Sequence, residues 1–65
     1  MELIINGIPK TLELRTLQEV IEHYELTGKP VIAEVDGQIV DSAAFGETQL
    51  QPGMRIELVH FVGGG

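Results

Sequence analysis

Residues 16–24 read TLQEVIEHY and predict a helix. Thr16 and Glu19 have the spacing of a capping box, in which an N-cap hydroxyl and a carboxylate three residues later bind the first backbone amides. Apolar residues then recur at i, i+3, i+4 and i+7, so that one face of the helix is apolar. These residues are Leu17, Val20, Ile21 and Tyr24. Gly28 and Pro30 are typical of helix ends, and we expect the helix to end at them.

Strand patterns flank this helix on both sides. They are rich in β-formers or alternate between apolar and polar residues, and they cover residues 2–6, 10–14, 31–35, 39–40 and 54–60. Asn6-Gly7 and Asp36-Gly37 predict tight hairpin turns, because both dipeptides tolerate positive φ. Pro9 lacks an amide donor, so we expect it in the turn or at a strand start. Gln51-Pro52-Gly53 predicts a further turn.

One short helix with four or five strands predicts an α+β domain, in which a mixed sheet packs on the helix. The chain between the first and last strands is long enough for a crossover, so these two strands can lie parallel at the centre. That arrangement is the β-grasp, or ubiquitin-like, fold. We expect the domain to cover residues 1–61 and a flexible glycine tail to cover residues 62–65.

The composition narrows the classes of function. The chain has 65 residues, four basic and ten acidic side chains, a formal charge of −6 and no cysteine. Disulfides and thiolate metal sites are therefore excluded, and nucleic acid or an anionic membrane is a poor partner for so acidic a chain. No apolar run approaches the length of a transmembrane helix, and the start lacks a basic signal-peptide region, so we expect a cytoplasmic protein.

Few residues suit catalysis. His23 and His60 are the two histidines, and a catalytic role for either requires a partner group and a pocket, for which so small a domain has little room. The carboxylates follow the polar phases of the predicted helix and strands, which indicates a solvated acidic surface rather than a metal site. We therefore expect no bound metal or cofactor, and a protein that is not an enzyme.

The chain ends in Gly63-Gly64-Gly65, which adds nothing to a core. Such an end is either frayed or functional. In the functional interpretation, glycines without side chains pass through a narrow channel of another enzyme and bring the Gly65 carboxylate to a bound nucleotide, with Gly64 as its necessary neighbour. A ubiquitin-like fold upstream favours this interpretation.

The alternation of the strands also predicts a docking surface. If Ile56 and Leu58 face the helix, alternate residues of the last strand face away from it. The apolar residues with this outward phase are Ile4, Ile32, Val59 and Phe61. We expect these four, with Val62 and Gly63 of the tail, to contact partner proteins, and the alternative is that Phe61 folds back over the edge of the core.

The whole chain resembles the ThiS family of sulfur carriers of thiamine (thiazole) biosynthesis. The resemblance rests on Asn6-Gly7, Thr16-Leu17, residues 35–40, residues 48–53, residues 56–59 and the terminal Gly64-Gly65. This sequence departs from the pattern at Asp36, where Asn is more common, and at Asp41-Ser42, Phe45 and Met54. The departures leave the expected fold intact and bear on contacts made by the loop at residues 41–46.

The resemblance implies a specific chemistry. A ThiF-like adenylating enzyme would use ATP and magnesium to convert the Gly65 carboxylate to an acyl-adenylate, and a sulfur-transfer protein would supply the sulfur of a thiocarboxylate. A ThiG-like thiazole synthase would take that sulfur. The free carrier would be a monomer.

Two other functions share this fold and terminus. One is a sulfur carrier like the small subunit of molybdopterin synthase, and the other is a ubiquitin-like modifier that is attached to lysines. A third possibility is an interaction module with an inert tail.

Overall fold

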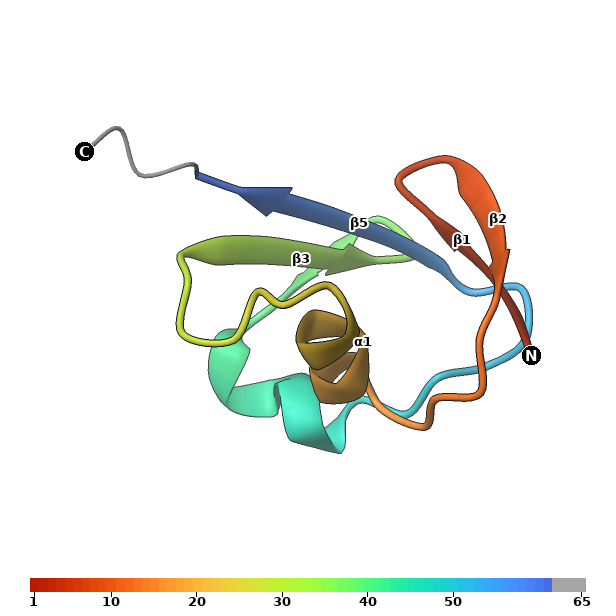
Figure 1. Ribbon diagram of the computed structural model, residues 1–65, viewed down its shortest axis with the longest axis horizontal. Coiled ribbons are helices and arrows are strands. Elements are labelled where there is room, and N and C mark those ends of the chain that lie inside the picture. The colour runs from red at the N-terminus through yellow and green to blue at the C-terminus, as the bar shows by residue number, and fades with distance from the viewer. Residues whose placement is uncertain (62–65) are drawn as a thin grey trace.

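The computed structural model of the protein describes residues 1–61, and the predicted tail at residues 62–65 lies outside the described residues. The strands are β1 (Glu2–Ile5), β2 (Ile8–Thr11), β3 (Val31–Val35), β4 (Gln38–Val40) and β5 (Arg55–His60). They form a five-stranded sheet in the order β2-β1-β5-β3-β4, in which β5 runs parallel to β1 and antiparallel to β3 (Figure 1). The expected mixed sheet with parallel first and last strands is confirmed.

The helix α1 (Leu17–His23) and the 3₁₀ helix η1 (Ser42–Glu47) lie on one side of the sheet (Figure 1). The core between these layers contains Leu3, Ile5, Leu17, Val20, Ile21, Leu26, Ala33, Phe45, Leu50, Ile56 and Leu58. Within residues 1–61 no helix covers the opposite side of the sheet, where Ile32 and Val59 are exposed (Figure 1). None of the helices formed by residues 1–61 has the length and hydrophobicity that a transmembrane passage requires.

Both predicted hairpin turns are present. Asn6 and Gly7 have φ values of 52° and 79°, and Asp36 and Gly37 have values of 49° and 87°. Positive φ at both central residues is the type I′ geometry, whose twist matches that of the flanking strands. Gly53 has a φ of 81° after Pro52, and the Met54 amide donates to the Gln51 carbonyl at 3.1 Å, as the predicted turn requires.

The second strand begins earlier than the predicted residues 10–14. The turn at Asn6-Gly7 has two residues, so Ile8 pairs directly with Ile5 and β2 is complete at Thr11, opposite the first residue of β1. Pro9 therefore lies inside β2, and not in the turn or at the strand start as expected. The strand tolerates Pro9 because β2 is at the edge of the sheet, where a missing amide costs no ladder bond.

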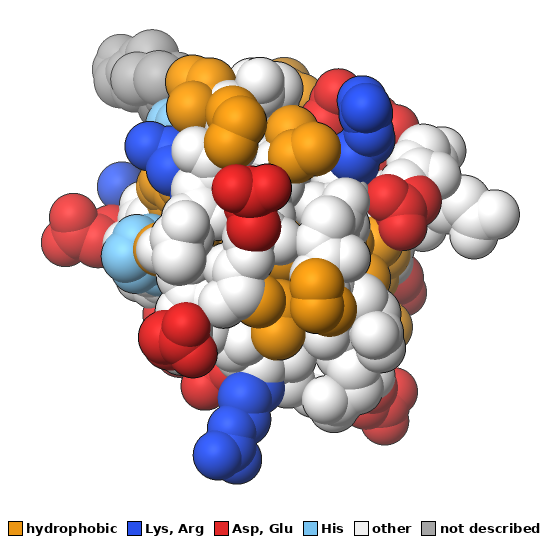
Figure 2. Space-filling model, turned by 90° about the vertical axis from the view of Figure 1, so that its right-hand side faces the viewer, with side chains coloured by type: hydrophobic (Ala, Val, Ile, Leu, Met, Phe, Trp, Pro, Cys, Tyr) orange, Lys and Arg blue, Asp and Glu red, His pale blue; other side chains and the backbone are white. Residues whose placement is uncertain are grey.

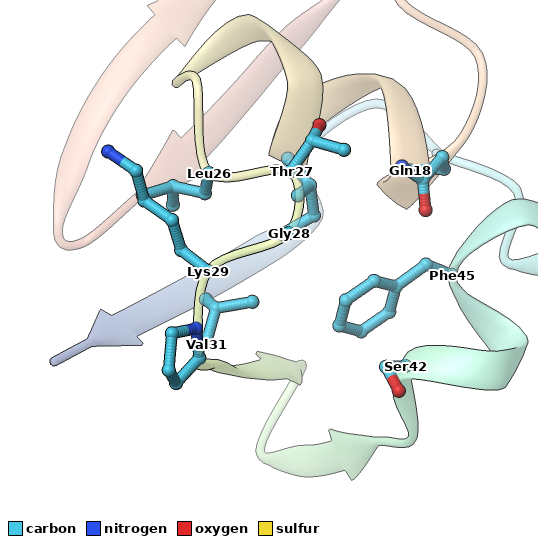
Figure 3. Close-up of a pocket in the computed structure, with 10 residues that line it drawn as sticks. Gln18, Leu26, Thr27, Gly28, Lys29, Val31, Ser42 and Phe45 are labelled. Atoms are coloured by element: carbon cyan, nitrogen blue, oxygen red, sulfur yellow. The ribbon is translucent and has the colours of Figure 1, made fainter.

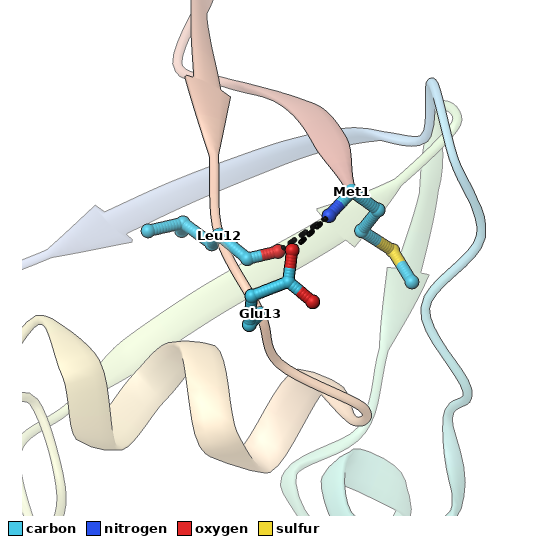
Figure 4. Close-up of polar contacts among 3 residues, drawn as sticks. All are labelled: Met1, Leu12 and Glu13. Atoms are coloured by element: carbon cyan, nitrogen blue, oxygen red, sulfur yellow. Dashed lines mark hydrogen bonds and ion pairs between the residues drawn. The ribbon is translucent and has the colours of Figure 1, made fainter.

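Beyond β2 the chain is held by the first residue. The Met1 carbonyl accepts a hydrogen bond from the Leu12 amide, and the Met1 ammonium donates to the Leu12 carbonyl at 2.9 Å and to Glu13 Oε1 at 3.1 Å (Figure 4). Leu12 and Leu14 are half-buried against the core, although they lie outside the strand.

The helix starts as predicted and ends earlier. Thr16 is the N-cap of a complete capping box with Glu19. The helix ends at Tyr24, before Gly28, because Glu25 adopts a left-handed φ of 58°. The Glu25 amide donates to the Glu22 carbonyl and the Leu26 amide donates to the Ile21 carbonyl at 2.9 Å, which is the Schellman motif. Leu26 packs in the core beside the helix, and this buried contact stabilises the motif.

Residues 41–50, which show no period in the sequence, contain η1. Phe45 projects from η1 into the core and anchors this segment. The Thr48 carbonyl accepts a hydrogen bond from the Leu17 amide, so the segment after η1 also binds the first turn of α1.

The left-handed Glu25 gives a first testable prediction. Because a side chain at positive φ is strained and glycine is not, Glu25→Gly should stabilise the domain by about 0.5–1 kcal/mol. The control is Glu22→Gly, inside α1, which should destabilise by about 1 kcal/mol. Urea unfolding followed by circular dichroism measures both changes, and destabilisation by Glu25→Gly would contradict the assigned helix end.

Candidate functional site

The candidate site is the end of β5, from which the chain leaves the sheet. β5 has a neighbouring strand on each side, β1 and β3, and it ends at the side of the molecule opposite the N-terminus (Figure 1). Ile56 and Leu58 are buried on the helix side, and this packing fixes the direction in which β5 points. The fold therefore presents the residues that follow β5 from a strand anchored at the centre of the sheet.

Asn6 binds β5 from the β1 side through two hydrogen bonds. Its amide donates to the Ile56 carbonyl at 2.9 Å, and its side-chain Oδ1 accepts from the Leu58 amide at 2.8 Å. In a regular parallel ladder the second bond would go to the backbone carbonyl of Asn6. That carbonyl is turned away by the left-handed conformation, and the side-chain carbonyl takes its place.

Asp36 binds β5 from the β3 side, also through two hydrogen bonds. Its amide donates to the Arg55 carbonyl at 2.8 Å, and its Oδ1 accepts from the Arg55 amide at 3.0 Å. The sequence indicated both turns through their positive-φ residues. The side-chain bonds to β5 were missed, because they join residues far apart in the chain.

The residues expected to carry the chemistry, Gly64 and Gly65, lie outside the described residues, as do the expected contact residues Val62 and Gly63. Phe61 is the last described residue, and its amide donates to the Pro30 carbonyl at 3.3 Å. Its side chain is 60% exposed, so it does not fold back over the core.

The sheet face away from α1, called here the outer sheet face, holds the other expected contact residues. Ile32 and Val59 are directly opposite each other on β3 and β5, and both are exposed. Phe61 continues the outward phase of Val59. Ile4 is half-buried and pairs with Arg55, toward the other end of β5. The outer sheet face thus brings Ile32 and Val59 together and holds Ile4 apart from them.

Two carboxylates lie between Ile4 and the Ile32–Val59 pair. Glu34 and Glu57 are opposite each other on β3 and β5, between the Ile32–Val59 pair and the Ile4–Arg55 pair. Glu34 also pairs with Ile39 of β4, whose side chain is 73% exposed on the same face. Ile39 was missed as a surface residue, although its alternation with Val40 places it on the outward phase.

The acidic side chains are spread over the surface. Figure 2 shows carboxylates dispersed across one face, and hydrophobic side chains both near its upper edge, which is the sheet side of the molecule, and near the middle of the same face. Within residues 1–61, no group of three or more His, Asp or Glu side chains is placed to hold a metal ion. The one ion pair of this part of the chain joins the Met1 ammonium to Glu13.

A larger hollow than expected lies between the end of α1, residues 26–31 and η1 (Figure 3). Its volume is about 430 Å³, although the length of the chain suggested little room for a pocket. Phe45 and the backbone of the loop form much of its wall, and the amino group of Lys29 points away from Phe45 and Ser42. No histidine or carboxylate is among its described lining residues, so an acid–base pair is missing there.

The histidines do not meet in the fold. The His23 ring packs edge-on against Tyr24, with 5.1 Å between ring centroids, at the end of α1. His60 ends β5 and lines a separate hollow of about 130 Å³ together with Tyr24 and Leu26.

Comparison with known proteins identifies the family to which the chain belongs. The model of the ThiS family matches residues 3–65, which is nearly the whole chain. The chain belongs to the ThiS family. The sulfur carrier protein ThiS of Bacillus subtilis (strain 168) is 40% identical over 50 residues, which are 77% of this chain and 76% of that protein.

Solved structures of a ThiS thiamine biosynthesis protein from Geobacter metallireducens have the same fold. Its crystal structure is 28% identical and matches with a TM-score of 0.82, covering all of both chains. Its NMR structure matches with the same score and identity and covers 88% of that chain. These findings confirm the β-grasp fold and support a role of this protein as a sulfur carrier in thiamine biosynthesis.

The bond from Leu58 to Asn6 gives a second prediction. Asn6→Gly keeps the positive φ and removes the acceptor, so the buried Leu58 amide loses its partner, at a cost of about 1–3 kcal/mol. Asn6→Asp retains an acceptor and should destabilise clearly less. Chemical unfolding measures the free energies, and amide hydrogen exchange at Leu58 should accelerate in Asn6→Gly alone. Equal stability of the two variants would contradict the role of the side chain.

Proposed function

We propose that the protein carries sulfur as a thiocarboxylate at Gly65 for the formation of the thiazole ring of thiamine. The observation that carries the proposal is the family match, which extends through the terminal glycines to residue 65. The fold supports it, because β5 lies between two strands of the sheet and the glycines follow it in the sequence, after Phe61 and Val62.

The proposed reaction begins at the terminal carboxylate. A carboxylate oxygen of Gly65 attacks the α-phosphorus of ATP, pyrophosphate leaves, and an acyl-adenylate forms. The terminal sulfur of a donor persulfide then attacks the carbonyl carbon and AMP leaves. A thiol attacks the donor's sulfur in the resulting S–S bond and forms a disulfide with the donor, and the thiocarboxylate leaves on the carrier. Thiazole synthase would be the acceptor of this sulfur.

The carrier needs enzymes for each of these steps. Adenylyl transfer depends on positioning and on cations that neutralise the phosphate charge, and the chain has four basic residues against ten acidic ones. We therefore assign ATP and magnesium to a ThiF-like adenylating enzyme, and the sulfur to a transfer protein. The carrier supplies a nucleophile on a tether, as a co-substrate rather than a catalyst.

The outer sheet face is the proposed docking surface for these enzymes. Ile32, Val59 and Phe61 form an apolar strip on its tail side, and exposed apolar groups of this kind favour contacts with other proteins. Val62 and Gly63 would continue the contact toward the partner's channel, and Ile4 would lie at its margin. The Glu34–Glu57 pair and the net charge of −6 favour a basic partner surface.

A third prediction tests the tail. Removal of Gly65 moves the carboxylate back by roughly 3.5 Å and should abolish loading with sulfur. Gly64→Ala adds a methyl group in the channel and should impair loading while the fold is unchanged. Gly46→Ala is the matched control, since a methyl group there meets open space. Intact mass after incubation with ATP, a ThiF-like enzyme and a persulfide donor detects the replacement of oxygen by sulfur, and normal loading of the shortened chain would exclude the mechanism.

A fourth prediction tests the docking surface. Phe61→Ala should weaken binding to the adenylating enzyme about tenfold, which corresponds to 1.4 kcal/mol, while the melting temperature hardly moves because the ring is 60% exposed. Ile8→Ala is the control: Ile8 is 56% exposed but pairs with Ile5 and so lies off the outer sheet face. Calorimetric titration gives the affinities, and equal affinity of both variants would move the docking surface elsewhere.

Genetic rescue distinguishes a role in thiazole formation from a role in molybdopterin formation. The protein should restore growth of a thiazole auxotroph that lacks its own carrier and should not restore a molybdopterin auxotroph. Covalent attachment to other proteins in the same cells would instead indicate a ubiquitin-like modifier.

A further inference from the structure

The second half of β5 has an open edge. β1 pairs with β5 only at Ile4↔Arg55 and Ile5↔Ile56, and the chain then turns away at Asn6-Gly7 into β2. The other edge of β5 stays paired with β3 as far as Val31↔His60. From Leu58 onward, β5 therefore has a strand on one side only within the described residues.

The pattern of hydrogen bonds identifies the groups on this edge. In a strand, the N–H and C=O of one residue point to the same side, and successive residues alternate. Arg55 and Phe61 bond toward the β3 side, to Asp36 and Pro30, so the odd-numbered residues of β5 face β3. Leu58 and His60 face the β1 side. The Leu58 amide donates to the Asn6 side chain. The Leu58 carbonyl, the His60 amide and the His60 carbonyl make no hydrogen bond within residues 1–61.

The space beside these groups is hollow. A cavity of about 130 Å³ is lined by Asn6, Leu58 and His60 along the edge and by Tyr24 and Leu26 below it. A regular continuation of β1 would run along this edge of β5, and one of its residues would donate to the Leu58 carbonyl and accept from the His60 amide. The turn at Asn6-Gly7 leaves that position to another chain.

We propose that an extended segment of the adenylating enzyme adds to the sheet along Leu58–His60 and so aligns the tail for entry into its active site. The inference rests on the proposed function, because it assigns the edge to the enzyme that receives the chain end. An extended backbone is the occupant that matches alternating amide and carbonyl groups, and strand addition to open sheet edges is an established way in which proteins bind peptides. The edge is continuous with Phe61 and the tail, so the docked segment would lie beside the first residues that enter the channel.

The test removes one hydrogen-bond donor from the edge. The chain can be made by chemical synthesis with an N-methyl group on the His60 amide, which points away from β3, so the β3–β5 ladder should remain. An N-methyl group on the Thr11 amide is the matched control, since β2 is an edge strand and this amide faces away from β1. We expect the His60 N-methyl variant to lose roughly 5- to 150-fold in affinity for the ThiF-like enzyme and in loading rate, the range for an unsatisfied buried group, and the Thr11 N-methyl variant to bind nearly as the unmodified protein does.

Each outcome decides a separate point. If the His60 N-methyl variant binds and loads as the unmodified protein does, the edge is not a contact and the inference is overturned, while the carrier function stands. If the unmodified protein itself acquires no sulfur, the proposed function fails instead. An ester in place of the His60 amide removes the N–H without a methyl group, and it replaces the His60 N-methyl variant if that variant has a lowered melting temperature. A dimer of the free protein that N-methylation of His60 abolishes would assign the edge to a second copy of the chain and overturn the proposal.

Discussion

The same pair of hydrogen bonds holds β5 on both of its sides at the centre of the sheet. On each side of the strand, the first residue of a type I′ turn donates its amide to a β5 carbonyl and accepts a β5 amide with its side chain. Asn6 and Asp36 suit this role because both tolerate positive φ and carry an oxygen two bonds from Cβ. A left-handed residue cannot offer its backbone carbonyl to the ladder. The side chain restores the lost bond, so that each hairpin can turn sharply and still bind the central strand.

The rest of the fold follows from this anchoring. With β5 fixed between β1 and β3, Ile56 and Leu58 are directed toward α1, and the core closes around them with Phe45 from η1. So small a domain buries a limited fraction of its surface, and each of these contacts therefore accounts for a large share of the stability. The same anchoring gives the end of the chain a fixed starting point, which a carrier needs if partner enzymes are to receive its last residues in a defined position.

Local patterns in the sequence predicted most of the fold. The capping box at Thr16, the two turns and the alternation of the strands each depend on neighbouring residues, and all three were confirmed. One error was local, because the two-residue turn at Asn6-Gly7 starts β2 at Ile8 and places Pro9 inside the strand. The other errors arose where tertiary contacts override local preference. Glu25 adopts the conformation expected of glycine because Leu26 is drawn into the core, and the helix ends before Gly28. The bond from Leu58 to Asn6 spans 52 residues, and no local pattern could indicate it.

For the candidate site, the sequence predicted which side chains face outward but not which of them are neighbours. The outward phases of Ile32 and Val59 follow from alternation alone, but only the strand register shows that they are opposite each other and that Glu34 and Glu57 separate them from Ile4. The open edge follows from the same register, because β1 ends opposite Ile56 and leaves the last four residues of β5 without a partner strand on that side. An uncovered edge next to a central strand invites unwanted pairing, and a longer β1 would close it. A short β1 has a rationale if the partner completes the sheet, because the hydrogen bonds missing from the free carrier would then contribute to the complex in which its tail reacts.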